Sequence, residues 1–396
     1  MASIINASNS GFGGIVSTGD SSGELKLQTT GTTALTIDTS QNVSLTGTLA
    51  MSSSFLRNRI INGAMVIDQR NAGASVTPTN NTYLLDRYKA GLTQASKFSV
   101  QQSSSAPAGY TNSMLVTSLS AYSIAAGDIF QIVQIIEGYN VSDLAFGTAS
   151  AKTITLSFWV RSSLTGTFGG AIQNNAQDRS YPFSYTISTA NTWTQISVTI
   201  TGDTTGTWLT TNGRGMLIIF SLGTGSTYSG TAGAWVGSDI ESVTGATSVV
   251  GTSGATFYIT GVQLEIGSTA TPFERRLYSQ ELANCQRYYE KSYELLTVPG
   301  ANTSIGVVHV SAASNGFGDM LTMIKFNVEK RTAPTMTFYR EDGTSGSWNM
   351  ERSGSNTTPS VTSSSVGDNG GRIYCATGAN WTVASLKGHW TSSAEL

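Results

Sequence analysis

Trp193-Thr194-Gln195-Ile196-Ser197-Val198-Thr199-Ile200 is the stretch that decides the fold class. Apolar side chains alternate here with Gln, Ser and Thr, which is typical of a β-strand with one buried and one solvated face. Residues 154–160, 216–220 and 257–266 are further strand-like runs. The connections are rich in Gly, Asn and Thr, which favour turns. We therefore predict two antiparallel sheets packed face to face, a jelly-roll β-sandwich over residues 56–275.

The composition supports a folded, β-rich protein. The chain has 396 residues, of which 43 are Gly, 39% are hydrophobic and 12% are charged. A disordered chain of low complexity lacks this much core-forming material. The length suggests two or three modules, because one domain usually takes about 100 to 200 residues.

Charge and hydropathy limit the possible partners and locations. The net charge of −2 provides no basic field for phosphates, so we expect no nucleic-acid partner. The first residues lack the basic flank and apolar core of a secretory signal, and no stretch approaches the ~20 apolar residues of a membrane span. We expect a protein assembled in the cytoplasm without membrane insertion.

Residues 1–55 hold short alternating runs at 25–27, 34–38, 43–46 and 49–51. Each run is too short to bury its apolar face alone. Identical chains wrapped around one axis would share these faces and close the sheet edges. This pattern predicts an N-terminal stem or attachment segment that is a homotrimer.

Residues 276–292 break the β pattern. Tyr278, Leu282, Cys285 and Tyr289 recur there at helical spacing among good helix formers, which predicts one short amphipathic helix as a connector.

Residues 293–396 return to β character and predict a second, smaller β-domain. Pro334 is expected to precede a strand, because proline cannot donate to a strand ladder. The strand-like runs are 305–310, 323–328, 336–339 and a terminal stretch around Trp381 and Trp390.

Catalytic chemistry has little support in this sequence. The chain has two histidines, which we interpret as a strand residue, His309, and an exposed tail residue, His389. Cys285 and Cys375 are too few for a disulfide framework or a thiolate metal site, so we interpret them as free, buried thiols. No phosphate-binding GK[ST] motif occurs. We expect no catalytic residue, no metal site and no cofactor.

Carboxylates and loop aromatics are the remaining candidates for a site. A glycosidase would need two carboxylates facing each other across a cleft, although loop solvation or a structural cation is the simpler role for each candidate. These carboxylates are Asp128, Glu137, Asp143, Asp178, Asp203, Asp239 and Glu241. Aromatic rings among polar loop residues suit glycan binding, because a sugar ring stacks on an aromatic plane, although core or subunit packing could also explain any one of them. The aromatic candidates are Tyr110, Tyr181, Trp208, Tyr228 and Trp235.

Several segments carry a family likeness. Residues 58–70 (Asn58-Arg59-Ile60-Ile61-Asn62-Gly63-Ala64-Met65-Val66-Ile67-Asp68-Gln69-Arg70), followed by 85–88, resemble the opening of the jelly-roll module found in many tail-fibre and related structural proteins of tailed bacteriophages. Residues 259–274 and the helix through 285–290 are similar to its closing segment. Residues 325–335 and 389–396 look like the C-terminal part of the same phage proteins, and the stem region around 33–43 looks like their stem.

The resemblance implies a non-catalytic virion component, held on the phage tail or on a baseplate or adaptor protein by residues 1–55. We interpret Asn62-Gly63 and Asp86-Arg87 as fold residues, because their side chains can satisfy turn amides. The leading hypothesis is a trimeric tail fibre that adsorbs the virion to a host surface polysaccharide. The alternative is a purely structural component, such as a head or collar fibre, a decoration protein or a tail adaptor. A depolymerising tailspike is disfavoured, since the chain lacks the repeats of a long β-helix.

Overall fold

The computed structural model describes residues 22–29, 32–45, 57–313, 319–352, 355–376 and 383–396. The chain forms two compact units, residues 1–54 and 55–396. The regular secondary structure of the described residues is nearly all β, in mostly antiparallel sheets, as the sequence predicted.

The first unit contains an antiparallel sheet of β1 (Leu25–Thr29), β2 (Thr32–Ile37) and β3 (Val43–Leu45). Its register pairs Leu25 with Ile37, Leu27 with Leu35, and Ile37 with Val43, so these apolar residues share one face. Leu25, Leu27 and Val43 are exposed by 47%, 45% and 63%. The strand expected at 49–51 lies outside the described residues.

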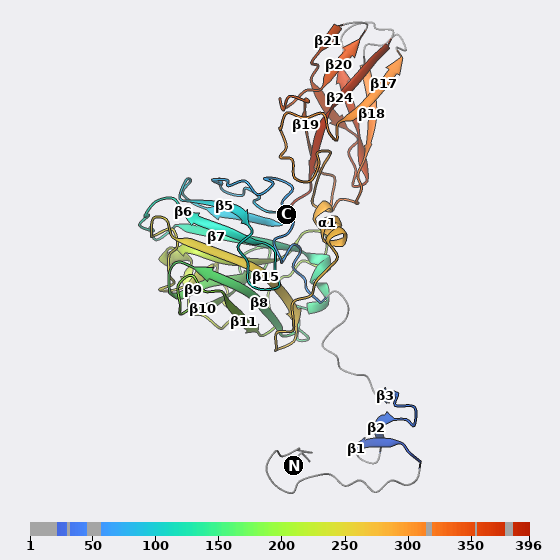
Figure 1. The fold of residues 1–396 in the computed structure, drawn as a ribbon. Helices are drawn as coiled ribbons and strands as arrows, with labels where there is room; N and C mark the ends of the chain where they lie inside the picture. Colours follow the sequence, from blue (N-terminus) through green and yellow to red (C-terminus); the bar gives the residue numbers. More distant parts are fainter. Residues whose placement is uncertain (1–21, 30–31, 46–56, 314–318, 353–354, 377–382) are drawn as a thin grey trace. The chain divides into compact units, whose positions relative to one another are not determined.

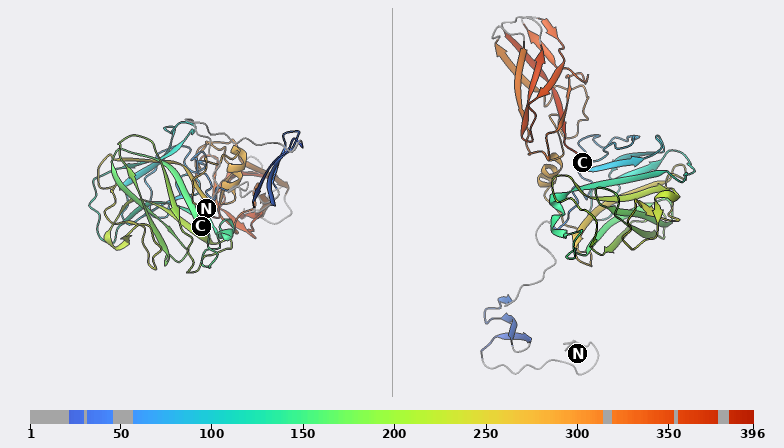
Figure 2. Two further views of the ribbon diagram at one scale, coloured as in Figure 1. Left: turned by 90° about the horizontal axis from the view of Figure 1, so that it is seen from below. Right: turned by 180° about the vertical axis from the view of Figure 1, so that it is seen from behind.

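Two five-stranded antiparallel sheets form a sandwich, which confirms the predicted architecture (Figure 1). The first sheet has the order β10 (Ser180–Ile187), β9 (Gly166–Gln173), β12 (Arg214–Thr224), β7 (Ile129–Glu137) and β4 (Tyr88–Leu92). The second has the order β11 (Thr194–Ile200), β8 (Ile154–Ser162), β15 (Thr256–Ile266), β6 (Ser113–Ser118) and β5 (Phe98–Ser103). Two further views show the two layers from other sides (Figure 2).

The core between the sheets follows from strand alternation. Phe158 and Phe257 of the second sheet pack among Phe168, Phe183 and Phe220 of the first, and all five are buried. Along β7 and β12, residues of this core alternate with a second buried apolar cluster on the outer face of the first sheet, made of Val133, Ile135, Leu217 and Ile219. The outer face of the first sheet therefore carries side chains that do not pack in the core between the two sheets.

The connection over the outer face contains three short elements. They are η3 (Ser226–Tyr228), β13 (Ser229–Gly230) and β14 (Ser242–Val243), and the last two pair in parallel. We call residues 226–243 the crossover segment. Two other 3-10 turns, η1 (Gly138–Asn140) and η2 (Ser142–Leu144), follow β7.

The helix α1 (Tyr278–Gln286) is shorter than the predicted connector 276–292. Cys285 is buried on its inner face, but Tyr278 is 50% exposed. The placement of Tyr289 in the helix was wrong, because β16 (Tyr289–Lys291) pairs with the final strand and extends the backbone there.

The remaining strands form two sheets. The first is centred on β24 (Val383–Ser393), which pairs with β16, β17 (Val308–Ala313), β19 (Thr335–Tyr339) and β20 (Asn349–Arg352). β20 also pairs with β21 (Ser355–Thr357). The second sheet has the order β18 (Asp319–Lys325), β23 (Gly370–Ala376) and β22 (Val361–Ser364).

Two expectations about this region are confirmed and one is wrong. Pro334 directly precedes β19, and the two described cysteines, Cys285 and Cys375, are buried thiols outside any disulfide. His389 is not an exposed tail residue: it lies buried in β24, stacks on Tyr293 at 3.7 Å, and bonds through Nε2 to the Thr303 carbonyl at 3.0 Å. Trp381 lies outside the described residues.

Charged side chains tie the sandwich to the last strands. Glu395 forms ion pairs with Arg70 and Arg87. Glu137, at the end of β7, receives two bonds from Arg287 at 2.7 and 2.9 Å. Residues 55–396 form one compact unit, so the finer boundaries expected at 275 and 292 stay predictions. Within the described part of the chain, no helix has the length and apolar character to span a membrane.

Candidate functional site

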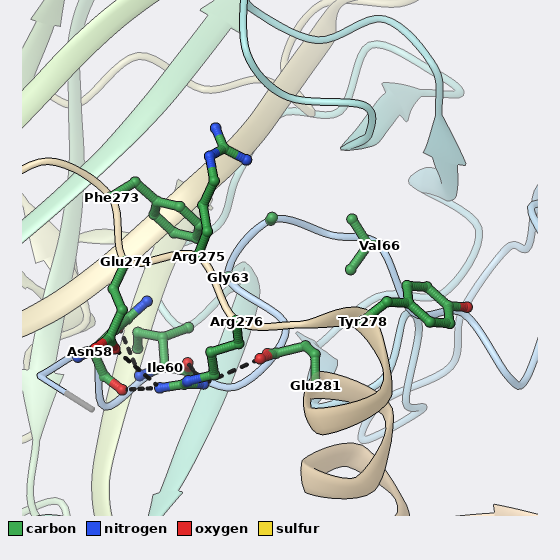
Figure 3. Close-up of a pocket in the computed structure, with 11 residues that line it drawn as sticks. Asn58, Ile60, Gly63, Val66, Phe273, Glu274, Arg275, Arg276, Tyr278 and Glu281 are labelled. Carbon is green, nitrogen blue, oxygen red and sulfur yellow. Dashed lines mark hydrogen bonds and ion pairs between the residues drawn. The ribbon is translucent and has the colours of Figure 1, made fainter. Parts of the chain in front are cut away.

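The turn at 57–67 and the segment 273–281 enclose a pocket of about 110 Å³ (Figure 3). Arg276 points toward Asn58 and Glu281, whereas Arg275 points away. The Arg276 guanidinium donates to the carbonyls of Asn58 and Ile60 and to Glu281, and the Glu274 carboxylate accepts from the Asn58 N–H at 2.9 Å. These polar groups bind one another, so their hydrogen bonds hold the turn at 57–67 against the segment 273–281.

The expected role of Asn62-Gly63 and Asp86 as fold residues is confirmed. The Asn62 side chain donates to the carbonyls of Ile67 and Asp86 and accepts from the Ile67 N–H at 3.0 Å. The Asp86 carboxylate accepts from the Gln69 N–H at 2.7 Å. A Cβ at Gly63 would collide with the Val262 carbonyl.

Three of the five aromatic candidates come together. Tyr181, Trp208 and Trp235 form an aromatic cluster with Phe146, in which ring centroids lie 4.9 to 5.8 Å apart. The expectation that Tyr181 lies in a polar loop was wrong: it belongs to β10 and is 6% exposed, because its side chain points into the core.

The two indole N–H groups of the aromatic cluster donate to the protein itself. Trp235 Nε1 donates to the Thr201 carbonyl at 2.7 Å, and Trp208 Nε1 donates to Asp203 at 3.3 Å. Asp203 also receives two bonds from Arg179 at 2.7 and 2.8 Å. The rings meet edge to face and pack against the sandwich core, so the cluster stabilises the fold.

Tyr110 is also held by neighbours. The Phe273 and Tyr110 rings meet edge to face with their centroids 5.3 Å apart, and the Arg275 guanidinium lies 4.8 Å from the centroid of the Tyr110 ring. The ring is half-buried between these side chains. Tyr110 is therefore not part of the aromatic cluster.

Tyr228 lies elsewhere, in a groove of about 240 Å³ on the outer face of the first sheet. β4, β7 and β12 supply the floor, and the crossover segment supplies Tyr228, Asp239 and Glu241. We call this site the polar groove. Its lining combines amides, carboxylates, two basic side chains and a few apolar ones: Asn80, Asn81, Lys89, Gly91, Ile129, Gln131, Val133, Gln177, Arg214, Leu217, Tyr228, Asp239 and Glu241.

Hydrogen bonds hold the crossover segment on the sheet. The Gln173 amide donates to Asp239 Oδ1 at 2.7 Å, and Ser180 Oγ donates to the Ser238 carbonyl at 2.7 Å. The Glu241 N–H donates to the Tyr228 carbonyl at 2.8 Å. These bonds place Tyr228 and both carboxylates along one groove.

Glu241 has the most unusual environment in the polar groove. It is 3% exposed, and nothing among the described residues hydrogen-bonds to its Oε2. Burial, and then the Asp239 charge, raise the pKa of Glu241 to about 8, while a bond from Gln131 lowers it. Burial also raises the pKa of Asp239. Gln131 Oε1 is a second buried acceptor to which nothing in the described ranges donates.

The other candidate carboxylates have partners of their own. Asp128 accepts from Thr93 and Tyr122, Asp143 pairs with Arg59, and Asp178 accepts from Asn174. Glu137 and Asp203 are the arginine-bound groups described above. Of the seven, the structure brings Asp239 and Glu241 into one groove.

The lining of the groove is that of a polar binding site. Burial, and then the Asp239 charge, raise the pKa of Glu241 to about 8, so a protonated carboxyl lies beside a second carboxylate. Among the described residues, no three His, Cys, Asp or Glu side chains are grouped to hold a metal ion. What the groove offers is a tyrosine, amides and unpaired acceptors, the groups that bind sugar hydroxyls.

Sequence reasoning missed the groove's amides. Gln131 stands among apolar residues in β7, which is the signal of a polar residue on an otherwise apolar strand. Gln134 on the same strand lies outside the groove lining and donates to the Ile61 carbonyl at 2.7 Å. The partners of Gln131 come from the crossover segment about a hundred residues later, so this signal could not reveal the site.

No protein-family model matches the chain, and no curated protein matches it. Solved structures that align include the tailspike protein 4 enzymatically active domain of bacteriophage CBA120, at 12% identity and a TM-score of 0.31, over 53% of this chain and 22% of that one. TmCBM61 in complex with β-1,4-galactotriose aligns at 9% identity and a TM-score of 0.28, over 53% of this chain and 99% of that one.

The family 11 carbohydrate-binding module from Clostridium thermocellum, in complex with a mixed-linked tetrasaccharide, aligns at 12% identity and a TM-score of 0.26. The alignment covers 50% of this chain and 98% of that one. These neighbours are thus a phage tailspike domain and carbohydrate-binding modules. Similarity this low carries no argument about this chain.

Proposed function

We propose that this protein is a tail fibre of a bacteriophage virion that binds a host surface glycan without cleaving it. The polar groove is the proposed binding site. The observation that carries the proposal is that Glu241 and Gln131 each have a buried oxygen with no hydrogen-bond partner among the described residues, beside Tyr228 and Asp239. A buried acceptor without a partner costs about 1–3 kcal/mol, which a sugar hydroxyl that donates to it would recover.

The first unit supports a homotrimer in this proposal. One face of its three-stranded sheet carries Leu25, Leu27, Leu35, Ile37 and Val43, three of which are exposed. A small sheet with an uncovered apolar face needs further packing for stability. Three copies would bury these faces together, and residues 1–55 would attach the trimer to a tail, baseplate or adaptor protein.

Several weak sites on one rigid trimer would then act together. A single groove of about 240 Å³ holds about one or two sugar units, so each site alone would bind weakly. Repeating polysaccharides present many identical units, and simultaneous binding at three sites raises the overall affinity.

The second candidate function is a purely structural virion component, such as a head or collar fibre, a decoration protein or a tail adaptor. Large apolar side chains outside the groove favour it, because neighbouring subunits could cover them. Leu277 is 77% exposed, Leu296 80% and Met323 70%.

The two functions are separated by binding of the full chain to a panel of bacterial surface polysaccharides. Half of the panel is first oxidised with periodate, which cleaves vicinal diols. The glycan proposal expects trimers in light scattering and binding that periodate abolishes. Binding should fall in Tyr228→Ala but not in Tyr110→Ala, the matched loop tyrosine outside the groove. Folded trimers that ignore every polysaccharide would contradict glycan binding and favour the structural component.

A further inference from the structure

We propose that the polar groove selects a saccharide with a free amino group, and that Glu241 binds its ammonium with help from Asp239. This inference rests on the proposed function and names the ligand class of the same site. The hydrogen-bond donors and acceptors around these two carboxylates support it.

The acidic end of the groove offers acceptors whose neighbouring donors are already used. The Gln173 amide donates to Asp239, Ser180 and the Ile240 carbonyl. The Gln131 amide bonds to Glu241, which leaves Gln131 Oε1 and Glu241 Oε2 without described partners. When Glu241 is ionised, a ligand group that fits here must donate, and it must donate more than once.

Charge narrows the choice among donors. Asp239 and Glu241 repel each other when both are ionised, and burial strengthens that repulsion. A hydroxyl group donates one hydrogen and leaves the charges uncompensated. An ammonium donates three hydrogens and neutralises charge, so it forms the stronger, charge-assisted bonds.

The basic side chains belong to another part of the groove. Arg214 is held by two bonds to Asn175, at 2.9 and 3.1 Å, and Lys89 Nζ donates to Asn81 at 3.1 Å. Asp239, rather than either base, is the charge that shifts the pKa of Glu241. The charges around the proposed ammonium are therefore negative.

A divalent metal ion fits less well than an ammonium. Calcium takes six to eight oxygen ligands and magnesium requires octahedral geometry. The described residues provide two carboxylates here and no group of three acidic or other metal-binding side chains. Two carboxylates and one amide oxygen match the three hydrogens of an ammonium.

Binding should be coupled to the proton on Glu241. The charged and titratable side chains that line the groove with Glu241 are Asp239 and Tyr228 on the crossover segment, Lys89 on β4 and Arg214 on β12, and Gln131 on β7 adds an amide. Burial, and then the Asp239 charge, raise the pKa of Glu241 to about 8. In the free protein near neutral pH Glu241 is mostly protonated, so an incoming ammonium displaces that proton into solvent.

The test titrates the full chain calorimetrically with glucosamine oligomers and with the matched N-acetylglucosamine oligomers, at about pH 6, where the sugar amine is protonated. We expect the free-amine oligomers to bind about tenfold more tightly, with proton release that appears as a buffer-dependent enthalpy. Glu241→Gln should abolish the preference and the proton release. Asp178→Asn, an exposed carboxylate outside the groove lining, controls for general attraction of a cation to an acidic protein and should leave both unchanged.

Other outcomes would overturn the inference. These are equal binding of the two oligomers, a preference for the acetylated one, equally tight binding of a lysine oligomer, or saturable calcium binding that Glu241→Gln removes. Thermal melting shows whether Glu241→Gln is folded, and if it is not, Asp239→Asn is read in its place. If the polysaccharide panel still binds while the amine preference is absent, this inference fails and glycan binding stands. If nothing on the panel binds, the proposed function fails as well.

Discussion

The aromatic cluster and the polar groove contain the same kinds of residue but use their polar atoms differently. In the cluster, both indole N–H groups bind the protein and Asp203 is paired with Arg179. In the groove, Glu241 and Gln131 keep acceptors without described partners. An aromatic ring in a polar loop therefore does not identify a binding site by itself. Unpaired hydrogen-bonding groups beside the ring are the better indicator.

The largest expected effect is on stability, from Trp208→Ala in the aromatic cluster. Losing a half-buried indole that packs on Phe146 and Trp235 should lower the free energy of unfolding by about 3 kcal/mol. Chemical denaturation measures this change. The folded variant should keep its polysaccharide binding. Loss of binding at unchanged stability would contradict this account, because it would assign the binding site to the aromatic cluster.

The next effect is on the pH dependence of stability, through Glu241→Gln. The folded-state pKa of Glu241 is raised to about 8, so its contribution to stability is present below its unfolded pKa and is lost as pH rises toward about 8. Removing the charge should stabilise the variant by roughly 2 kcal/mol at about pH 9 relative to wild type, and by much less at about pH 5. Denaturation curves at both pH values measure this. A variant destabilised equally at both would show that Glu241 is a satisfied core residue.

A smaller effect is expected on binding, from Tyr228→Ala in the groove. The loss of one stacking platform should weaken polysaccharide binding about tenfold, or ~1.4 kcal/mol, with little change in melting temperature. Surface plasmon resonance with the wild type as reference measures the ratio. Tyr110→Ala is the matched control, and equal losses in the two variants would remove the distinction between the sites.

The smallest effect should come from Trp235→Phe. This change keeps an aromatic ring but removes the N–H that donates to the Thr201 carbonyl, which should cost about 1 kcal/mol of stability. Binding should not change. Weaker binding in this variant, with the melting curve intact, would indicate that the indole contacts the glycan.

The sequence predicted the strands well because their signal is local. Alternation in 193–200 and in 257–266 depends on neighbours one or two residues apart, and both runs are strands at nearly the expected bounds. The end of the helix was less predictable, since the pairing of Tyr289 with Ser393 depends on a strand a hundred residues away.

The site was less predictable for the same physical reason. Tyr228, Asp239 and Glu241 were all among the candidates, yet nothing in the sequence separated them from Tyr181 or Asp203. The separation depends on which polar atoms find partners after folding. Gln131, Lys89 and Arg214 join the groove from strands far apart in the chain.

The most direct test is a crystal structure of the full chain with an oligosaccharide from a polysaccharide that it binds. The account predicts the sugar in the polar groove, against Tyr228, with a donor group within hydrogen-bonding distance of Glu241 Oε2. A sugar stacked on Trp208 or Trp235, with the groove unchanged, would contradict it.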